Sequence, residues 1–230
     1  VPPTYKFLTA NVTISKKYPQ VRNYLDPYVI YKIQGKKIAV VGLTTNSLAY
    51  AWRFTAGKLE SPYRPGDIFA KHLKRRKGVD YVIALTHLGI GADIKLAKKS
   101  KYIDLIIGGH SHNSLFRTVY QKNKKGRRIP IVQAGSHGNY LGQIKLKVEK
   151  KSLKLAKYRL HRVENIKKDP VIDKFVQGMY QNLKKEYGKN WDTKVYGHSF
   201  LTSKKKWSSM NSWGVYIAKS VQKSARADIG

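Results

Sequence analysis

Short runs of apolar and β-branched residues open the chain and predict that it begins with strands. The runs extend from Tyr5 to Ala10, from Tyr28 to Ile33 and from Lys37 to Leu43. Gln34-Gly35 separates the second run from the third, and a two-residue connection that ends in glycine is typical of a tight hairpin. We therefore expect two antiparallel strands joined at Gln34-Gly35.

Between residues 67 and 112 the pattern alternates between the helical and the extended period. The order strand, helix, strand, helix, strand is typical of parallel βαβ units in an α/β layer. Asp67 and Asp93 stand where N-caps are expected, and Gly78 stands where the first helix should stop. The expected segments are a helix from Ile68 to Leu73, a strand from Tyr81 to Thr86, a helix that carries Ile94, Leu96 and Ala97, and a strand from Ile103.

The second half of the chain turns from strands to helices. The expected elements are strands from Ile129 to Ala134, Leu141 to Val148 and Leu155 to Arg162, a helix from Asp169-Pro170 to Gly188, a helix from Trp213 to Ala225, and a strand starting at Ala227. Gly135 to Tyr140 is a glycine-rich loop, read equally well as a plain turn or as a close approach to a substrate. We infer an α/β domain at 1–165, a linker helix at 166–189 and the beginning of another domain at 190–230.

Composition narrows the class of protein. The 230 residues include no cysteine, which excludes a disulfide framework and a zinc finger. No apolar run approaches the roughly 20 residues that a membrane helix needs, and the first ten residues lack the arrangement of a signal peptide. We expect a chain without a membrane span.

The charge is unusual. Lys and Arg number 46 against 13 Asp and Glu, a net charge of +33 that exceeds what solubility requires and attracts polyanions. The densest clusters, Lys71 to Lys77, Lys122 to Arg128 and Lys204 to Lys206, fall on a helix and two loops. Because a nucleic-acid footprint is usually one stripe with interleaved aromatics, the pattern favours a solvated basic surface, with nonspecific polyanion binding as the alternative.

Three histidines stand where strands of the α/β layer end. His87 follows the strand from Tyr81, and the strand from Ile103 runs through Gly108-Gly109 into His110 and His112. The carboxyl ends of neighbouring parallel strands meet at one edge of a sheet, where α/β folds bind ligands. Neutral imidazole is a common metal ligand. His87, His110 and His112 are therefore candidate metal ligands.

Other polar residues carry weaker signals. Asp80 and Asp104 begin strands, on the edge opposite the histidines, which indicates a turn or capping role. Asn11 ends a strand and is a minor candidate for the site. His137, in the glycine-rich loop, is left open. Histidines without evident partners are read as structural or exposed, and they are His72, His161 and His198.

Four motifs along the chain agree in order and spacing with one known family. They are Leu8-Thr-Ala-Asn-Val12, Ile83-Ala-Leu-Thr-His-Leu-Gly89, Asp104-Leu-Ile-Ile-Gly-Gly-His-Ser-His112, and Val132-Gln-Ala-Gly135 with Tyr140-Leu-Gly142. Together they resemble the 5′-nucleotidase branch of the calcineurin-like metallophosphoesterases. Asn211-Ser-Trp-Gly214 and Ala225-Arg-Ala-Asp-Ile229 are similar, more loosely, to the opening of that family's C-terminal domain. The resemblance implies an α/β fold that is the second half of a two-sheet sandwich with αββα layers, a linker helix, and the start of an α/β C-terminal domain.

The resemblance also implies a hydrolase with two divalent ions, such as Zn²⁺ or Mn²⁺. By motif position, His87 and His110 would bind one ion and His112 the other. The family's Asp-x-His, Gly-Asp and Asn-His-Glu/Asp segments are absent from the chain, since Gly66-Asp67 suits a helix cap and Gly138-Asn139 is followed by Tyr140. We expect those segments before residue 1, so that the chain supplies about three of eight ligands and no catalytic residue. Without a bridging carboxylate two ions about 3.5–4 Å apart repel, so at most one is expected here.

The implied activity is hydrolysis of nucleotide phosphoesters, with this chain inactive alone. The alternatives are a noncatalytic basic scaffold that binds nucleic acid or another polyanion, a structural remnant without activity, and a sister chemistry on cyclic phosphodiesters, nucleotide sugars or thiosulfate esters. The resemblance implies export to the periplasm or the exterior. Substrate, preferred metal and oligomeric state are not determined by the sequence.

Overall fold

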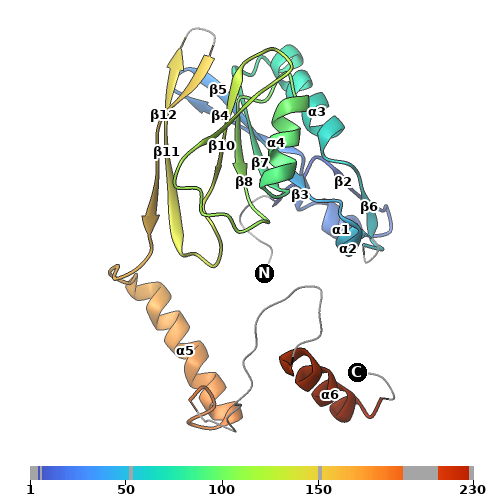
Figure 1. Ribbon diagram of the computed structural model, residues 1–230, viewed down its shortest axis with the longest axis vertical. Coiled ribbons are helices and arrows are strands. Elements are labelled where there is room, and N and C mark those ends of the chain that lie inside the picture. Colours follow the sequence, from blue (N-terminus) through green and yellow to red (C-terminus); the bar gives the residue numbers. More distant parts are fainter. Residues whose placement is uncertain (1–4, 6, 52–53, 150–151, 194–211, 228–230) are drawn as a thin grey trace. The chain divides into compact units, whose positions relative to one another are not determined.

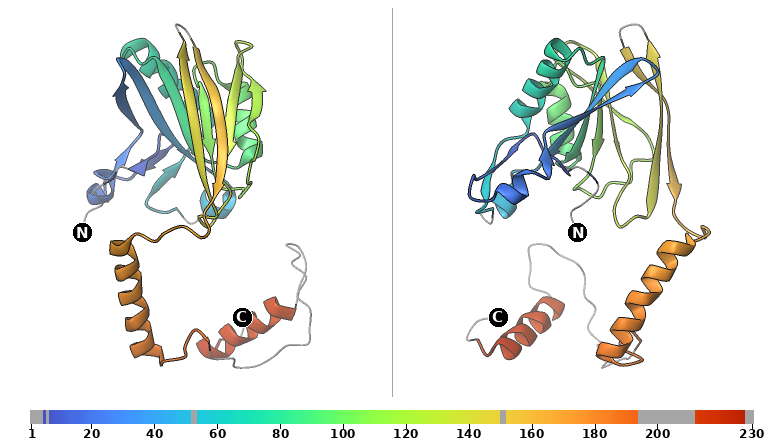
Figure 2. Two further views of the ribbon diagram at one scale, coloured as in Figure 1. Left: turned by 90° about the vertical axis from the view of Figure 1, so that its left-hand side faces the viewer. Right: turned by 180° about the vertical axis from the view of Figure 1, so that it is seen from behind.

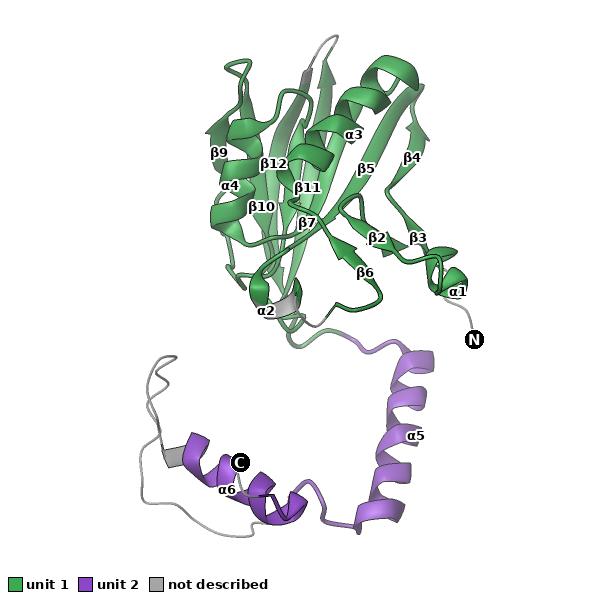
Figure 3. Ribbon diagram, turned by 90° about the vertical axis from the view of Figure 1, so that its right-hand side faces the viewer, with its two compact units in different colours: residues 1–166 green, residues 167–230 purple. Residues whose placement is uncertain are grey.

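The computed structural model describes residues 5, 7–51, 54–149, 152–193 and 212–227. The chain separates into two compact units, residues 1–166 and 167–230 (Figure 3). This boundary lies near the predicted change from sheet to helix. The identities assigned above to the three segments of the chain stay predictions.

A six-stranded sheet forms the centre of the first unit (Figure 1). Its four inner strands are parallel and its two outer strands are antiparallel to their neighbours, so the predicted βαβ order is confirmed. The predicted hairpin is also confirmed, with Gln34 and Gly35 both at positive φ between paired strands. In spatial order the strands are β4 (Tyr28–Ile33), β5 (Lys36–Thr44), β7 (Tyr81–His87), β8 (Leu105–Gly108), β10 (Arg128–Gln133) and β9 (Val119–Lys122).

Two helices cover one face of this sheet, α3 (Tyr63–Arg76) and α4 (Ile90–Lys99) (Figure 1). Leu73 from α3 and Leu96 from α4 are fully buried in the main hydrophobic cluster, with Val82 and Ile106 from the strands beneath them. The near-continuous apolar runs of β7 and β8 are what a parallel sheet covered on both faces requires. The core therefore holds rigid the strands that end at the histidines.

Both predicted helix caps are wrong. α3 starts four residues before Asp67, and the carboxylate of Asp67 accepts hydrogen bonds from the Ser100 hydroxyl and the Lys101 amide instead. Gly89 is the N-cap of α4, and Asp93 lies inside its first turn with its side chain buried. A carboxylate near a helix start is recognisable in sequence, but its partner is chosen by elements distant along the chain. The predicted stop at Gly78 is correct, because that residue follows the C-cap with φ of +62°.

A hairpin of β11 (Tyr140–Glu149) and β12 (Ser152–Arg162) lies against the other face of the sheet (Figure 2). Two tyrosine hydroxyls join the layers: Tyr81 donates to the Glu149 carbonyl at 2.8 Å, and Tyr158 donates to the Gln133 carbonyl at 3.0 Å. The unit is thus layered as helices, sheet and second sheet, and the expected α/β class is confirmed.

Besides β4 and β5, the first sixty residues form smaller elements at the side of the sheet. They are β1 (Phe7–Leu8), β2 (Val12–Ile14), α1 (Pro19–Arg22), β3 (Leu25–Asp26), α2 (Leu48–Ala51) and β6 (Gly57–Leu59). β1 packs on β5 where Gly42 has no side chain, since a Cβ there would stand 2.0 Å from the Leu8 carbonyl oxygen. The strand expected from Tyr5 to Ala10 is accordingly short.

Two helices are described in the second unit, α5 (Pro170–Tyr187) and α6 (Ser212–Ala225). The Asp169 side chain caps α5 by accepting hydrogen bonds from the amides of Val171 and Ile172. The helix ends at Gly188, as the sequence predicted. The strand expected from Ala227 falls mostly outside the described residues. None of the described helices is both long and apolar enough to cross a membrane.

Candidate metal-binding edge

The carboxyl ends of β7 and β8 bring His87 and His110 together. The two strands are parallel neighbours, with Leu85 opposite Ile107, so their ends reach the same edge. Gly109 lies against the end of β7, where a Cβ would stand 3.3 Å from the Thr86 carbonyl oxygen and 3.4 Å from the His87 Nδ1 atom. The His87 Nε2 and His110 Nδ1 atoms are 3.3 Å apart.

This separation fits a shared metal ion. Two ring nitrogens bound to one tetrahedral Zn²⁺ at Zn–N lengths of about 2.0–2.1 Å lie about 3.3–3.4 Å from each other. A hydrogen bond between the two rings is also possible at 3.3 Å, but it is longer than the usual N–H contact of about 2.9–3.0 Å. The distance by itself is compatible with either arrangement.

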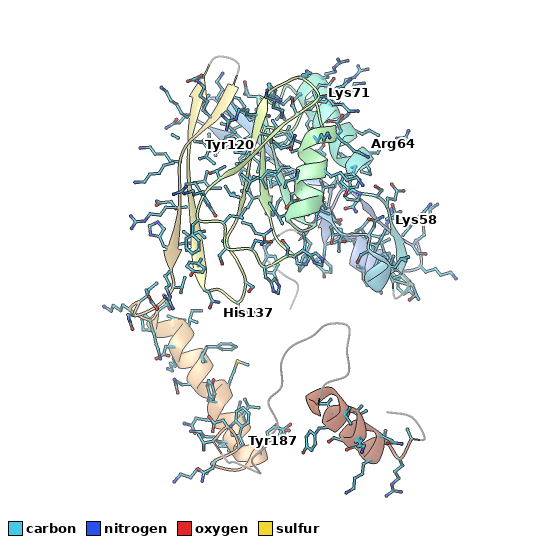
Figure 4. All side chains as sticks on the ribbon, viewed as in Figure 1. Lys58, Arg64, Lys71, Tyr120, His137 and Tyr187 are labelled. Atoms are coloured by element: carbon cyan, nitrogen blue, oxygen red, sulfur yellow. The ribbon has the colours of Figure 1, made fainter. Side chains whose placement is uncertain are left out.

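The remaining candidate histidines lie on adjacent loops. The His112 ring meets the His137 ring edge-on, with ring centres 5.6 Å apart, whereas the His87 and His110 ring centres are 4.9 Å apart. His137 lies at the end of the unit where the histidine-bearing loops emerge (Figure 4). The sequence left His137 open, and the structure places it beside His112.

Three of the four histidines have left-handed backbone. The φ angles are +78° at His110, +57° at His112 and +57° at His137. Such angles are uncommon for residues with a side chain, and they cluster at functional sites where the surrounding structure holds them. The loops thus hold these histidines in backbone conformations that their own side chains disfavour.

Gln133 holds the loop that carries His110 and His112. Its side chain is buried at the end of β10, where Oε1 accepts from the Asn113 amide at 2.7 Å and the Ser111 hydroxyl at 3.1 Å. Its Nε2 donates to the Gly109 carbonyl at 3.1 Å. The sequence analysis did not select Gln133 as a site residue, and the only signal was its place in the Val132-Gln-Ala-Gly135 motif.

A buried carboxyl group lies behind the histidines. Asp93 Oδ1 accepts a 2.6 Å hydrogen bond from the Thr86 hydroxyl, next to His87, and among the described residues Oδ2 has no hydrogen-bond partner. Burial raises the pKa of Asp93 to about 6 against the opposing effect of Thr86. A Cβ at Gly108 would stand 2.3 Å from Asp93 Oδ2, so a side chain at this position would have to displace the Asp93 carboxylate.

The surroundings of His87 favour its neutral form. Burial, and then the neighbouring rings of His110 and His112, lower the pKa of His87 below its usual value. A lowered pKa leaves the imidazole neutral at physiological pH, which is the form that binds metals.

The site is incomplete as a metal cage. Within the part of the chain that the structure describes, no group of three or more His, Asp, Glu or Cys side chains is arranged to hold a metal ion. The assignment of His87, His110 and His112 as ligands therefore stays a prediction. What the histidine pair offers is an incomplete set of nitrogen ligands without a carboxylate.

The other polar candidates have structural roles. Asn11 is buried, donates to the Thr44 and Glu60 carbonyls and accepts from the Thr44 amide, so its side chain joins the end of β5 to the segment at Glu60. Asp80 accepts from the Lys37 amide, and Asp104 accepts from the Val82 amide, at the opposite edge of the sheet. A structural function was expected for both carboxylates.

The remaining histidines lie away from the site. His72 is exposed on α3. His161 is not without a partner, as the sequence suggested, because its Nε2 lies 2.9 Å from Gln143 Oε1 across the hairpin. His198 and the basic run Lys204 to Lys206 lie outside the described residues.

Known proteins similar to this chain are phosphoesterases. It is 29% identical over 170 residues to the trifunctional nucleotide phosphoesterase protein YfkN of Bacillus subtilis, covering 66% of this chain and 11% of that protein. It is 30% identical over 193 residues to protein UshA of Yersinia enterocolitica, covering 72% of this chain and 34% of that protein. No family model matches the chain.

Solved structures that are similar to this chain belong to the same kinds of protein. The 5′-nucleotidase precursor from Thermus thermophilus superposes with a TM-score of 0.69 at 25% identity, covering 79% of this chain and 38% of that one. The calcineurin-like phosphoesterase YfkN from B. subtilis superposes with a TM-score of 0.60 at 24% identity, covering 81% of this chain and 64% of that one, a likeness of fold. The matched part of the chain spans about a tenth of the length of the YfkN protein and about a third of the length of the UshA protein.

Proposed function

Because this chain is related to the 5′-nucleotidases and calcineurin-like phosphoesterases over most of its length, we propose that it supplies the histidine side of a metal-dependent site that hydrolyses nucleotide phosphoesters. The observation that carries the proposal is the 3.3 Å separation of His87 Nε2 and His110 Nδ1 at the edge where the sheet ends. Relatives named for nucleotide phosphoester and 5′-nucleotide chemistry support the substrate class.

In this proposal His87 and His110 hold one divalent ion and His112 faces the position of a second. A bound ion would polarise the phosphate ester and lower the pKa of a coordinated water. The residues of the chain do the positioning: β7 and β8 set the pair, and Gln133 fixes the loop between Gly109 and Asn113. The chain contributes ligands, and further ligands, including an anionic bridge, must come from a polypeptide that carries carboxylates.

Titration of the 230-residue chain with Zn²⁺ by calorimetry tests the ligand assignment. We expect at most one weakly bound ion, and at least tenfold weaker binding after His87→Ala or His110→Ala, because each removes half of the preformed pair. His161→Ala is the matched control, since that histidine lies on β12 with Gln143 as its partner. Equal binding by all four proteins would contradict the assignment.

Phosphate release from AMP in Mn²⁺ or Zn²⁺ tests the incomplete site separately. We expect no efficient turnover by the chain alone, because three neutral imidazoles do not balance the charge of two cations. Turnover of about 1 per second or more, an ordinary enzymatic rate, would show that the described ligands suffice.

A further inference from the structure

The two densest basic clusters that the structure describes come together at the edge of the sheet opposite the histidines. They are about fifty residues apart in sequence, one at the end of α3 and one in the turn between β9 and β10. Tyr102 contacts both: the Arg75 guanidinium carbon is 5.9 Å and the Lys125 Nζ atom 4.7 Å from the centre of its ring. Figure 4 shows Lys71 of α3 near this end, away from His137.

Asp104 joins the same two clusters below the surface. Its nearly buried carboxylate forms ion pairs with Lys74 Nζ at 2.6 Å and with Arg127 NH1 at 2.7 Å. The Arg127 guanidinium also donates to the Lys101 carbonyl, and the Lys124 amide donates to the Ser100 carbonyl. The turn is therefore fastened beside the ends of α3 and α4.

The exposed cations that result form one surface. Arg75 and Lys125 lie over the Tyr102 ring, Lys101 precedes Tyr102 in the chain, and the Lys124 amide is bonded to Ser100; all four side chains are exposed, and we call these four residues the amino-edge surface. Asp67 and Asp104, the carboxylates in contact with this region, are engaged with backbone amides, the Ser100 hydroxyl or the ion pairs below. Among the described residues no ion pair to a carboxylate neutralises the four side chains.

The dipole of a helix explains the position of only one of these four cations. Cations in the last turn of a helix are stabilised by about 0.3–1 kcal/mol, which accounts for Arg75 at the end of α3. Lys124 and Lys125 belong to a β-turn, where no such dipole acts. Contact with Tyr102 holds Arg75 and Lys125 in place despite their mutual repulsion. Cations gathered and oriented in this way are suited to a multivalent anion.

The composition of the surface favours phosphates in water over a membrane. Membrane-binding surfaces insert large apolar side chains, and no exposed large hydrophobic residue occurs at 71–77, 98–101 or 122–128. Arginine and lysine together are the usual contacts to nucleic-acid phosphates. Both flanking cations lie against the Tyr102 ring, so this aromatic orients charge and is not an open stacking platform for bases.

We propose that the amino-edge surface binds the phosphate backbone of nucleic acid without reading its sequence. The proposal is independent of the phosphoesterase site, which lies at the other end of the strands. It replaces the expectation of a merely solvated surface, because the structure unites clusters that are separate in sequence.

Fluorescence anisotropy with a labelled duplex of about 20 base pairs tests the proposal on the 230-residue chain between 50 and 200 mM salt. The test variant changes Arg75, Lys101, Lys124 and Lys125 to Gln. The matched control changes Lys145, Lys147, Lys157 and Arg159, exposed on the β11–β12 hairpin, to Gln and lowers the charge equally. The slope of log affinity against log salt is negative. We expect its magnitude to decrease by about 3–4 in the test variant, roughly one per phosphate contact, and by less than about 1 in the control.

A second comparison tests the role of Tyr102. Tyr102→Leu removes the ring that orients Arg75 and Lys125 and should weaken binding several-fold, whereas Tyr102→Phe keeps the ring and should bind as the parent does. Circular dichroism checks that each variant is folded.

Three results would overturn the proposal. Equal losses in the test and control variants would mean that binding follows total charge, and a larger loss in the control would move the surface to the hairpin. Binding to vesicles of anionic phospholipid with none to the duplex would identify a membrane surface instead.

Discussion

At the scale of single residues, the histidine edge depends on groups that do not themselves bind a ligand. Asp93 is the clearest case, since it is fully buried, accepts one hydrogen bond from Thr86, and lies against Gly108 two residues before His110. A buried carboxylate with one unpartnered oxygen is costly when ionised. Ionised Asp93 therefore lowers the stability of the fold directly behind the candidate ligands.

Asp93→Asn should change how stability depends on pH. The pKa of Asp93 is about 6 in the folded chain and near 3.8 in an unfolded one, so the folded state binds the proton more tightly. The contribution of Asp93 to stability is then full below about pH 4 and is lost as the pH rises through 6. The variant, which cannot ionise, should gain up to about 3 kcal/mol relative to the parent between pH 4 and 7, measured by urea unfolding. A difference that stays constant over this range would contradict the assignment.

At the scale of elements, the loop from Gly109 to Asn113 belongs as much to β10 as to β8. β8 delivers the loop, but the hydrogen bonds of Gln133 determine its path, and the isolated bridge between Ser114 and Ala134 continues the contact. The left-handed angles of His110 and His112 persist because this neighbour holds them.

Gln133→Leu should therefore destabilise the fold and loosen the loop. The substitution keeps the volume but leaves the partners of three hydrogen bonds unsatisfied, and we expect a loss of about 2–4 kcal/mol in the free energy of unfolding. Zn²⁺ affinity should fall as well, because residues that orient ligands contribute to binding. Gln121→Leu is the control, since the Gln121 side chain donates one exposed hydrogen bond to the next residue and should cost less than about 0.5 kcal/mol. Equal losses of unfolding free energy in both variants would show that Gln133 does not hold the Gly109–Asn113 loop.

At the scale of the whole molecule, the core belongs to the first unit. Every residue of the main hydrophobic cluster lies between Ala39 and Ile131, while α5 contains no buried residue. α5 instead exposes large apolar side chains, including Phe175 and Met179. Within the described residues, the two units thus differ in kind, one with a packed interior and one made of amphipathic helices.

Ending the chain at Ile166 should leave the first unit folded. We expect its unfolding free energy, followed by circular dichroism in urea, to change by less than about 1 kcal/mol, because none of the described residues after Ile166 belongs to the main cluster. The histidine pair should keep its Zn²⁺ affinity. Loss of a cooperative transition after truncation would show that the helices of the second unit are needed for the sheet.

Local features of the fold were predictable where neighbours in sequence decide them. The turn at Gln34-Gly35, the stop at Gly78 and the end of α5 at Gly188 are correct because each depends on a few adjacent residues. Asp67 and Asp93 were misplaced because their hydrogen bonds go to Lys101 and Thr86, in other elements. A polar residue at a plausible cap position does not reveal a better partner that only folding brings near.

The sequence by itself determined the α/β layer, the parallel strand order and the placing of His87, His110 and His112 at strand ends, because periodicity and motif spacing are local properties of the chain. Only the tertiary structure decided which side chains meet. The 3.3 Å approach of His87 to His110, the three hydrogen bonds of Gln133 and the joining of two basic clusters at Tyr102 all link residues twenty or more positions apart. Such distances depend on strand register and helix packing, which follow from burying the whole core at once.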